Sequence, residues 1–216
     1  MKHPALIVFA KTPVPGRVKT RLCPPLTPQQ ACRLYAAFLS DILGEAVRLA
    51  QWRRVIAYAG DPDWFAPWRG DFELLEQQGA DLGERLLHAF EAVGTPAVGI
   101  GSDSPHLDSE VYRVAAERLG QVPVVIGPCT DGGYYLIALA RPVDLFTAMP
   151  MGTERLLAAT LGRGRSLDLA IGLLCEDSDV DTWADVQAVR ARLPAHSRRI
   201  LAAIEAELAC QDEPKQ

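Results

Sequence analysis

The sequence predicts an α/β protein with a mostly parallel sheet, and three observations support this fold class. Short apolar runs alternate along the chain with longer segments in which apolar residues recur every three or four positions, as in successive βαβ units. Several runs are almost continuously apolar, which is typical of strands covered by helices on both faces. One run follows its predecessor too closely for a helical crossover, so we also expect an antiparallel strand.

The elements follow from these patterns in order. The run ALIVFA at 5–10 predicts a first buried strand, and the first helix is expected at 27–50. Thr27 is suited to cap that helix, with Pro28 at its first position and Gln30 three residues after the cap. Further strands are expected at 53–60, 71–78, 95–103, 122–128, 132–140 (the antiparallel one) and 170–177. Further helices are expected at 82–93, 108–119, 151–162, 182–193 and 195–209.

Length and composition indicate one globular domain. The 216 residues suffice for one sizeable α/β domain, and we find no repeat or linker, so we expect a single domain over 1–210 and a frayed tail at 211–216. The net charge of −5 argues against nucleic acid as a partner. The five scattered cysteines form no C-x-x-C pair, and the first apolar run is too short to cross a membrane. We therefore expect a cytoplasmic protein without a membrane partner; the sequence leaves its oligomeric state open.

A basic loop, KTPVPGRVKTRL at 11–22, follows the first expected strand. It carries no acid and four cations: Lys11, Arg17, Lys19 and Arg21. Gly16 would let the backbone approach a ligand closely, and Lys19 and Arg21 could donate charge-assisted hydrogen bonds to phosphate oxygens. The loop is therefore a candidate anion site, and the alternative is a solvated basic loop.

A carboxylate follows the central strand in GIGSDSPHLD at 99–108. Asp103 lies where an open α/β sheet places its ligands, beyond the carboxyl ends of the strands. Asp108 is the better candidate to cap the next helix, which leaves Asp103 available to hold Mg²⁺ or Mn²⁺. The alternative is that Asp103 caps a turn.

The third candidate stretch is acidic, LLCEDSDVDTWAD at 173–185. Its five carboxylates would repel one another unless they are solvated or neutralised by a cation: Glu176, Asp177, Asp179, Asp181 and Asp185. Asp181 could supply a second metal ligand. A solvated acidic turn followed by a helix cap is an equally suitable interpretation of any single member.

The segment GPCTDGGYYLIAL at 127–139 contains a fourth candidate, Asp131. Asp131-Gly132-Gly133 is suited to a hairpin turn, which is a purely structural interpretation. Asp131 would also stand at the mouth of the same crevice, where it could orient an acceptor or accept its proton.

Together these stretches resemble the DUF2064 family. The resemblance rests on four motifs in chain order: F-A-K-T-P-x-P-G-x-V-K-T-R-L at 9–22, G-x-D-S-P-x-L at 101–107, G-P-x-x-D-G-G-Y-Y-L-I at 127–137 and D-V-D-T-x-x-D at 179–185. Members are assigned as glycosyltransferases with the nucleotide-diphospho-sugar transferase (GT-A) fold, a three-layer α/β/α sandwich. Some are associated with radical-SAM proteins and with arsenosugar biosynthesis.

The resemblance implies roles for particular residues. In the wider superfamily the loop after the first strand wraps the nucleotide, which implies nucleotide binding by Lys11, Gly16, Lys19 and Arg21. The segment QQGADLGERL at 77–86 is similar to stretches that contact the base, which implies Gly79, Asp81 and Arg85. The metal-binding aspartates of the superfamily correspond to Asp103 and Asp181.

These features lead to three hypotheses about function. The first is a transferase, dependent on Mg²⁺ or Mn²⁺, that uses a nucleotide-sugar to glycosylate a small-molecule acceptor, with Asp103 and Asp131 as catalytic residues. The second is a nucleotidyltransferase, similar to guanylyl- or cytidylyltransferases, that joins an NTP to a phosphorylated acceptor and releases pyrophosphate. Pro105 favours this alternative, because many glycosyltransferases have a second acid there. The third is a nucleotide-binding protein without catalytic activity.

Overall fold

The computed structural model describes residues 4–212. Within them, the strands form one sheet in the order β3-β2-β1-β4-β6-β5-β7. The strands are β1 (Ala5–Lys11), β2 (Arg53–Ala59), β3 (Glu73–Glu76), β4 (Ala97–Ile100), β5 (Val124–Pro128), β6 (Tyr134–Leu139) and β7 (Ile171–Leu173). The α-helices are α1 (Pro28–Val47), α2 (Leu82–Val93), α3 (Ser109–Arg118), α4 (Leu156–Ser166), α5 (Trp183–Val189) and α6 (Ala195–Asp212), and the 3₁₀ helices are η1 (Thr20–Leu22) and η2 (Pro62–Trp68).

The pairing of the strands confirms the predicted fold class. β1 pairs in parallel with β2 and β4, β2 with β3, and β5 with β7. β6 is antiparallel to both β4 and β5, as expected from the short connection before it. That connection is a tight turn in which the N–H of Cys129 donates to the carbonyl of Gly133, and Gly132 adopts the positive φ (85°) that glycine tolerates.

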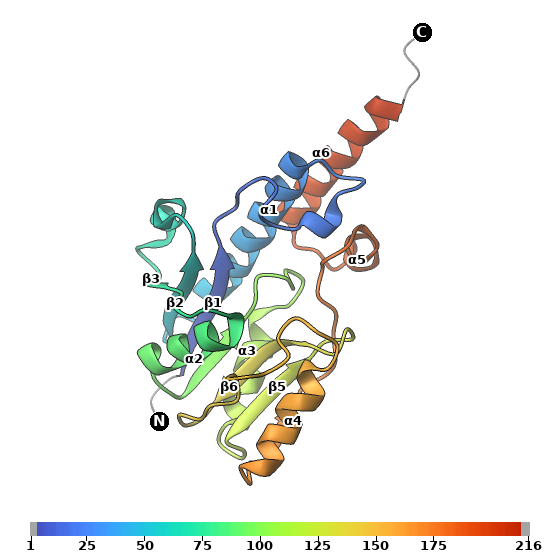
Figure 1. The fold of residues 1–216 in the computed structure, drawn as a ribbon. Coiled ribbons are helices and arrows are strands. Elements are labelled where there is room, and N and C mark those ends of the chain that lie inside the picture. The colour runs from blue at the N-terminus through green and yellow to red at the C-terminus, as the bar shows by residue number, and fades with distance from the viewer. Residues whose placement is uncertain (1–3, 213–216) are drawn as a thin grey trace.

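Helices cover both faces of the sheet and make a three-layer α/β/α arrangement (Figure 1). One hydrophobic core joins α1 and α3 to the sheet, with Leu39 of α1 and Tyr112 of α3 among its buried residues. A second core lies on the opposite face, where Phe90 of α2 and the partly buried Leu157 of α4 pack. None of the helices within residues 4–212 is long and apolar enough to pass through a membrane.

A third core lies beyond the sheet and joins the regions that flank the candidate site. α6 runs alongside α1 (Figure 1), and the fully buried Phe38 of α1 belongs to this core. Leu22, from the end of the basic loop, and Val180, from the acidic segment, are buried in the same core. Both polar segments are therefore held in place by apolar burial of their neighbours.

The start of α1 agrees with the sequence, although the helix ends at Val47 and not at residue 50, and both ends of α4 differ. Thr27 and Gln30 form the expected capping box of α1. α4 begins at Leu156 and ends at Ser166, whereas the expected helix spans 151–162. Gly152 lies in an irregular loop with φ 70°, and the helix continues past 162 to include Gly164, which packs closely against Ile171.

Two other segments lie outside the expected strands and helices or differ from expectation. The connection between β2 and β3 contains η2, capped by the side chain of Asp61, which accepts from the N–H of Asp63. The frayed tail expected at 211–216 falls mainly outside the described residues: α6 continues to Asp212, and 213–216 are not described.

Asp177 attaches the acidic segment to the end of β5. Its N–H donates to the carbonyl of Pro128, and its carbonyl accepts from the N–H of Thr130. Its carboxylate accepts from both terminal nitrogens of Arg192 and lies 3.1 Å from Nε2 of the buried His106. Burial alone would raise the pKa of Asp177, but the hydrogen bonds from Arg192, Ser178 and His106 lower it to about 2.

We predict that Asp177→Asn lowers the free energy of unfolding at pH 7 by about 1.5–3 kcal/mol, the usual size for hydrogen bonds to a charged group. A carboxyl whose pKa is depressed in the folded state contributes its stabilisation above its unfolded pKa and loses it as pH falls. The difference between wild type and variant should therefore be constant from pH 7 to 5 and shrink between pH 4 and 2. Urea unfolding across this range measures it.

Asp63→Asn provides the matched control, because the Asp63 side chain is 83% exposed and has one long ion pair with Arg69. It should change stability little at any of these pH values. A deficit of Asp177→Asn that stays the same down to pH 2 would contradict the role given to the ionised carboxylate.

Candidate functional site

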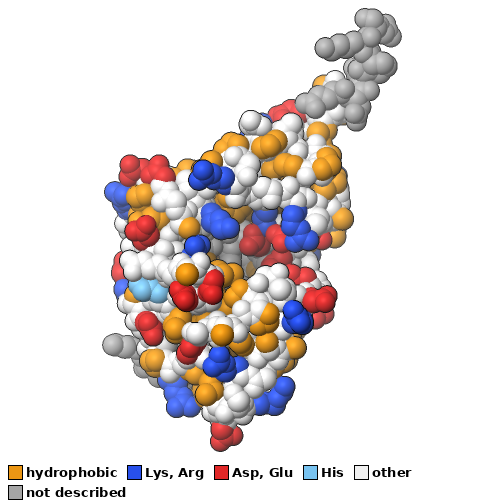
Figure 2. Space-filling view, in the orientation of Figure 1, with side chains coloured by type: hydrophobic (Ala, Val, Ile, Leu, Met, Phe, Trp, Pro, Cys, Tyr) orange, Lys and Arg blue, Asp and Glu red, His pale blue; other side chains and the backbone are white. Residues whose placement is uncertain are grey.

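A cavity of about 490 Å³ lies at the carboxyl ends of β1 and β4, within the usual size range of small-ligand sites. The basic loop, the loop after β4, the acidic segment, the hairpin turn before β6 and the loop before α4 all contribute to its lining. Figure 2 shows Lys and Arg side chains together with Asp and Glu side chains around the central hollow of this face. The topology thus brings together the four stretches that the sequence singled out.

Tyr35 of α1 fixes the end of β1 against the loop after β4. Its hydroxyl accepts from the backbone N–H of Lys11 at 3.0 Å and lies 3.0 Å from Oγ of the buried Ser102. Burial raises the pKa of Tyr35, so the phenol remains protonated and able to donate. Tyr35 and Ser102 both line the cavity, although helical periodicity alone identifies Tyr35 only as a core position.

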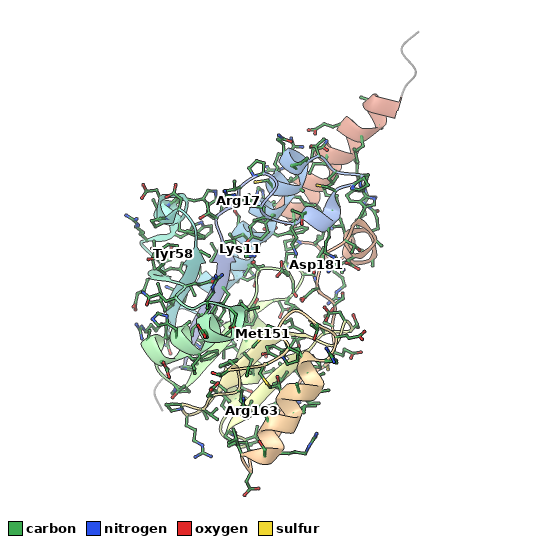
Figure 3. The ribbon with its side chains drawn as sticks, viewed as in Figure 1. Lys11, Arg17, Tyr58, Met151, Arg163 and Asp181 are labelled. Carbon is green, nitrogen blue, oxygen red and sulfur yellow. The ribbon has the colours of Figure 1, made fainter. Side chains whose placement is uncertain are left out.

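The outer part of the basic loop presents cations to the cavity. Lys11 and Arg17 are exposed and line it, and Figure 3 places both near the end of β1, with Asp181 and Met151 on other sides of this region. Within residues 4–212, no carboxylate forms an ion pair with either cation. Gly16 does not line the cavity; it has φ 76° in the turn closed by the hydrogen bond from Arg17 N–H to the Val14 carbonyl.

Lys19 has a different environment, because its ammonium is buried between two carboxylates. Nζ forms an ion pair with Oδ1 of Asp103 and donates to Oδ1 of Asp181 at 2.8 Å and to the carbonyl of Val180 at 2.7 Å. The Lys19 side chain is only 5% exposed, against 43% for Asp103 and 37% for Asp181. An ammonium has three N–H donors, so all three have protein acceptors here.

Electrostatics keep this group of residues charged. Burial alone would lower the pKa of Lys19, but Asp103 and Asp181 together hold it well above its usual range. Burial alone would raise the pKa of Asp181, whereas Lys19 and Arg21 hold it below its usual value. Arg21, whose side chain is 70% exposed, reaches Oδ2 of Asp181 at 3.2 Å. Lys19 and Asp181 therefore form an ion pair that persists at neutral pH.

Backbone contacts hold the two acidic stretches together. The N–H of Val180 donates to the carbonyl of Asp103 at 2.8 Å. Oγ of the buried Ser104 donates to Asp179 at 2.6 Å, and burial raises the pKa of Asp179. Asp103, Asp179 and Asp181 all line the cavity, whereas Asp108 caps α3.

The remaining acids of the segment have other positions. Asp185 forms the capping box of α5 with Thr182, and Asp177 is engaged by Arg192. Glu176 is exposed. The acidic stretch therefore combines both interpretations that the sequence left open, because some members cap or anchor and others face the cavity.

The donor set fits a divalent cation that arrives with a ligand. Carboxylate oxygens such as those of Asp103 and Asp181 are the ligands that Mg²⁺ and Mn²⁺ prefer, and the Lys19 ammonium already lies between them as a positive charge. Among the described residues, no group of three or more His, Cys, Asp or Glu side chains could hold a metal alone. Mg²⁺ is commonly held by one or two carboxylates together with substrate phosphates and water, which is compatible with this pair.

Asp131 stabilises the hairpin turn and is also accessible from the cavity. One carboxylate oxygen, Oδ1, accepts from the N–H of Gly133 at 2.9 Å and so stabilises the hairpin turn. Asp131 is nevertheless exposed and lines the cavity. Gly132 packs against the backbone of Glu154 so closely that a Cβ would lie 2.1 Å from its carbonyl oxygen. This close approach places the loop before α4 against the hairpin turn that carries Asp131.

The residues that the resemblance implies for base contacts lie outside the lining. Gly79, Asp81 and Arg85 do not line the cavity. Asp81 caps α2 by accepting from the N–H of Glu84, and Arg85 donates to the Gly79 carbonyl. Gly79 has φ 139° and leaves no room for a side chain against α2. Their role in binding a base stays a prediction.

Neighbours of these residues line the cavity instead, and the sequence did not single them out. Leu82, 45% exposed, and Leu86 form an apolar wall near Gln77. Nε2 of Gln77 donates to the carbonyls of Ala57 at 2.7 Å and Ala10 at 3.3 Å, so its amide is oriented by β1 and β2. The segment 77–86 contains all three residues, but local sequence does not show which side chains face inward.

Comparison with solved structures supports the fold. The structure is similar to a CMP:2-keto-3-deoxy-manno-octonic acid synthetase complexed with CTP, with a TM-score of 0.54, 13% identity and coverage of 88% of this chain and 97% of that chain. It is also similar to a cytidylyltransferase from Leptospira borgpetersenii serovar Hardjo-bovis, with a TM-score of 0.55, 12% identity and coverage of 100% and 99%. At these identities the likeness concerns the fold alone. Curated protein sequences gave no match.

Two further comparisons identify the family. A provisionally assigned nucleotide-diphospho-sugar transferase from Desulfovibrio desulfuricans G20 is 30% identical, with a TM-score of 0.85 and coverage of 97% of this chain and 98% of that chain. Residues 42–153 match the model of a family described as uncharacterized protein conserved in bacteria, DUF2064. The chain therefore belongs to the DUF2064 family and has the nucleotide-diphospho-sugar transferase fold.

Proposed function

We propose that the protein is a nucleotide-dependent transferase that uses a nucleotide-sugar donor to glycosylate a small-molecule acceptor. One observation carries this proposal: a single cavity combines cations that have no carboxylate partner among the described residues with a carboxylate pair suited to a divalent cation. The assigned class of the Desulfovibrio desulfuricans relative supports the proposal. One protein with a similar fold, a CMP:2-keto-3-deoxy-manno-octonic acid synthetase, has been solved in complex with CTP.

The cations would act on the diphosphate of the donor. Lys11 and Arg17 are exposed at the cavity and can donate charge-assisted hydrogen bonds to phosphate oxygens. Fixed charges that meet developing negative charge usually provide the largest share of catalysis in such sites. A Mg²⁺ or Mn²⁺ ion, held by Asp103 and Asp181 together with the phosphates, would neutralise further charge on the leaving diphosphate.

The acceptor would bind on the side of the hairpin turn. Asp131 of this turn lines the cavity, as does Met151 of the loop before α4. One oxygen of Asp131 is engaged by its own turn, which holds the carboxylate in position while its other oxygen can accept a proton from an acceptor hydroxyl.

Nucleotidyl transfer is a second candidate, and Pro105 favours it. This residue is buried two positions after Asp103, where many glycosyltransferases have a second acid. The basic loop has four cations in all, two of which pair with carboxylates in the free protein, and their total charge would suit the greater charge of a triphosphate. In this reaction a phosphorylated acceptor would attack the α-phosphate of an NTP and release pyrophosphate.

Calorimetric titration with nucleotide-sugars and their parent NTPs, each with and without Mn²⁺, separates the two reactions. We expect a nucleotide-sugar to bind more tightly than its parent NTP. Release of pyrophosphate from an NTP and a phosphorylated acceptor would favour the second candidate instead. Nucleotide binding that is unchanged by EDTA and by Asp103→Asn would favour a nucleotide-binding protein without catalytic activity.

Asp103→Asn should abolish turnover and preserve the fold. The substitution removes a negative charge that faces the cavity and one of the two anionic partners of Lys19, so a somewhat lower unfolding midpoint is also expected. Release of the nucleoside diphosphate from the best-bound nucleotide-sugar measures turnover, and circular dichroism checks the fold. Turnover equal to that of an Asp63→Asn control would refute a catalytic role for Asp103.

Arg17→Gln should weaken binding of the nucleotide about tenfold, since a hydrogen bond to a charged group contributes roughly 1.5–3 kcal/mol. Arg113→Gln is the matched control, because Arg113 is an exposed arginine on α3 that pairs with Glu110 and does not line the cavity. Calorimetry with both variants measures the difference. Equal affinities would show that the basic loop does not hold the phosphates.

A further inference from the structure

The position of the Lys19 ammonium has a consequence for how a divalent cation can enter the site. Its three N–H donors have acceptors on Asp103, Asp181 and Val180, and its side chain is 5% exposed. Both carboxylates direct Oδ1 toward it. A divalent cation shared by this carboxylate pair would compete for the same oxygens and would meet a fixed positive charge close by.

We propose that the Lys19 ammonium is an internal competitor of the divalent cation for the Asp103–Asp181 pair, and that the pair accepts the cation when Lys19 moves to the phosphates of the nucleotide. The inference rests on the proposed function, because it takes the divalent cation and the nucleotide phosphates from there. It adds that the free protein has low affinity for the cation alone. By linkage, the cation and the nucleotide then strengthen each other's binding.

The surroundings of Lys19 are compatible with such an exchange. Lys19 itself lines the cavity, together with Arg17 and Arg21, so its side chain borders the space in which the phosphates would bind. Its backbone has a left-handed conformation, φ 46° and ψ 41°, which is uncommon for a residue with a side chain. The flexible four-carbon side chain of lysine allows the ammonium to move while the backbone stays in place.

The carboxylates would keep a cationic partner in both states. In the free protein Lys19 neutralises them, and Arg21 adds a contact at 3.2 Å to Oδ2 of Asp181. In the complex the metal ion would neutralise them, and the phosphates would accept the lysine. The ammonium would not be left buried without a partner, which would be costly, and the half-exposed carboxylates would keep a neutralising cation.

Binding of Mn²⁺ alone tests this competition, because the paramagnetic resonance signal of free aqueous Mn²⁺ disappears when the ion binds. In the absence of nucleotide, Lys19→Met should bind Mn²⁺ at least tenfold more tightly than wild type. Arg21→Met is the matched control: it removes the same charge and also loses a contact with Asp181, but Arg21 is 70% exposed. Arg21→Met should increase the affinity for Mn²⁺ less than threefold.

Two further variants keep the test decisive. Lys19→Gln is also neutral but retains N–H donors for the Val180 carbonyl, so it serves if Lys19→Met does not fold. Adding Asp103→Asn to either Lys19 variant should remove the gain in Mn²⁺ affinity, because the gain requires the carboxylate.

The proposal is overturned if wild type binds Mn²⁺ alone as tightly as the Lys19 variants, or if these variants gain no more than Arg21→Met. Failure of the proposed function has a different signature. If no nucleotide binds to wild type, the transferase proposal fails, whereas a tenfold gain of Lys19→Met in Mn²⁺ affinity still establishes the competition.

Discussion

A single buried ammonium organises the candidate site. Lys19 brings a positive charge into a region where only 5% of its side chain meets solvent, and a charge in such a place is costly unless it is paired and hydrogen-bonded. The partners that satisfy it come from two distant segments: Asp103 from the loop after β4, and Val180 and Asp181 from the segment before α5. The wall of the cavity is therefore held together by the same groups that would act on a ligand.

Buried apolar residues next to Lys19 and Asp181 in the chain fix the position of this ion-pair cluster. Leu22 follows Lys19 closely in the chain and is fully buried in the core formed by α1, α5 and α6. Val180 precedes Asp181 and is buried in the same core, while its N–H donates to the carbonyl of Asp103. Asp177 fixes the other end of the acidic segment through Arg192 and the end of β5. Buried apolar residues and backbone hydrogen bonds thus hold the segments that carry Lys19, Asp103 and Asp181.

Most of the fold could be predicted because its signals are local. The apolar runs, the capping box at Thr27 and the short connection before β6 identify strands, helix starts and the antiparallel strand without any knowledge of contacts. α4 differs from prediction at both ends: Gly152 lies in a loop with positive φ, and the last turn includes Gly164, which packs against Ile171. The second of these is a tertiary contact that periodicity does not reveal.

The site was predictable in its segments but not in its contacts. The charge of the basic loop and the position of Asp103 after a buried strand indicate a crevice with cations and carboxylates, yet nothing in the spacing shows that Lys19 pairs with Asp103 and Asp181. Gln77 likewise lines the cavity. Its amide is oriented by hydrogen bonds to the carbonyls of Ala10 and Ala57, which are distant from it along the chain.

A crystal structure with Mn²⁺ and the best-bound nucleotide-sugar tests the central claim most directly, because anomalous scattering locates the metal ion without ambiguity. We predict Mn²⁺ between the carboxylates of Asp103 and Asp181, with the ammonium of Lys19 moved onto the diphosphate and Arg17 also in contact with it. A nucleotide bound outside this cavity, or Lys19 still paired with both aspartates beside a bound diphosphate, would contradict the claim.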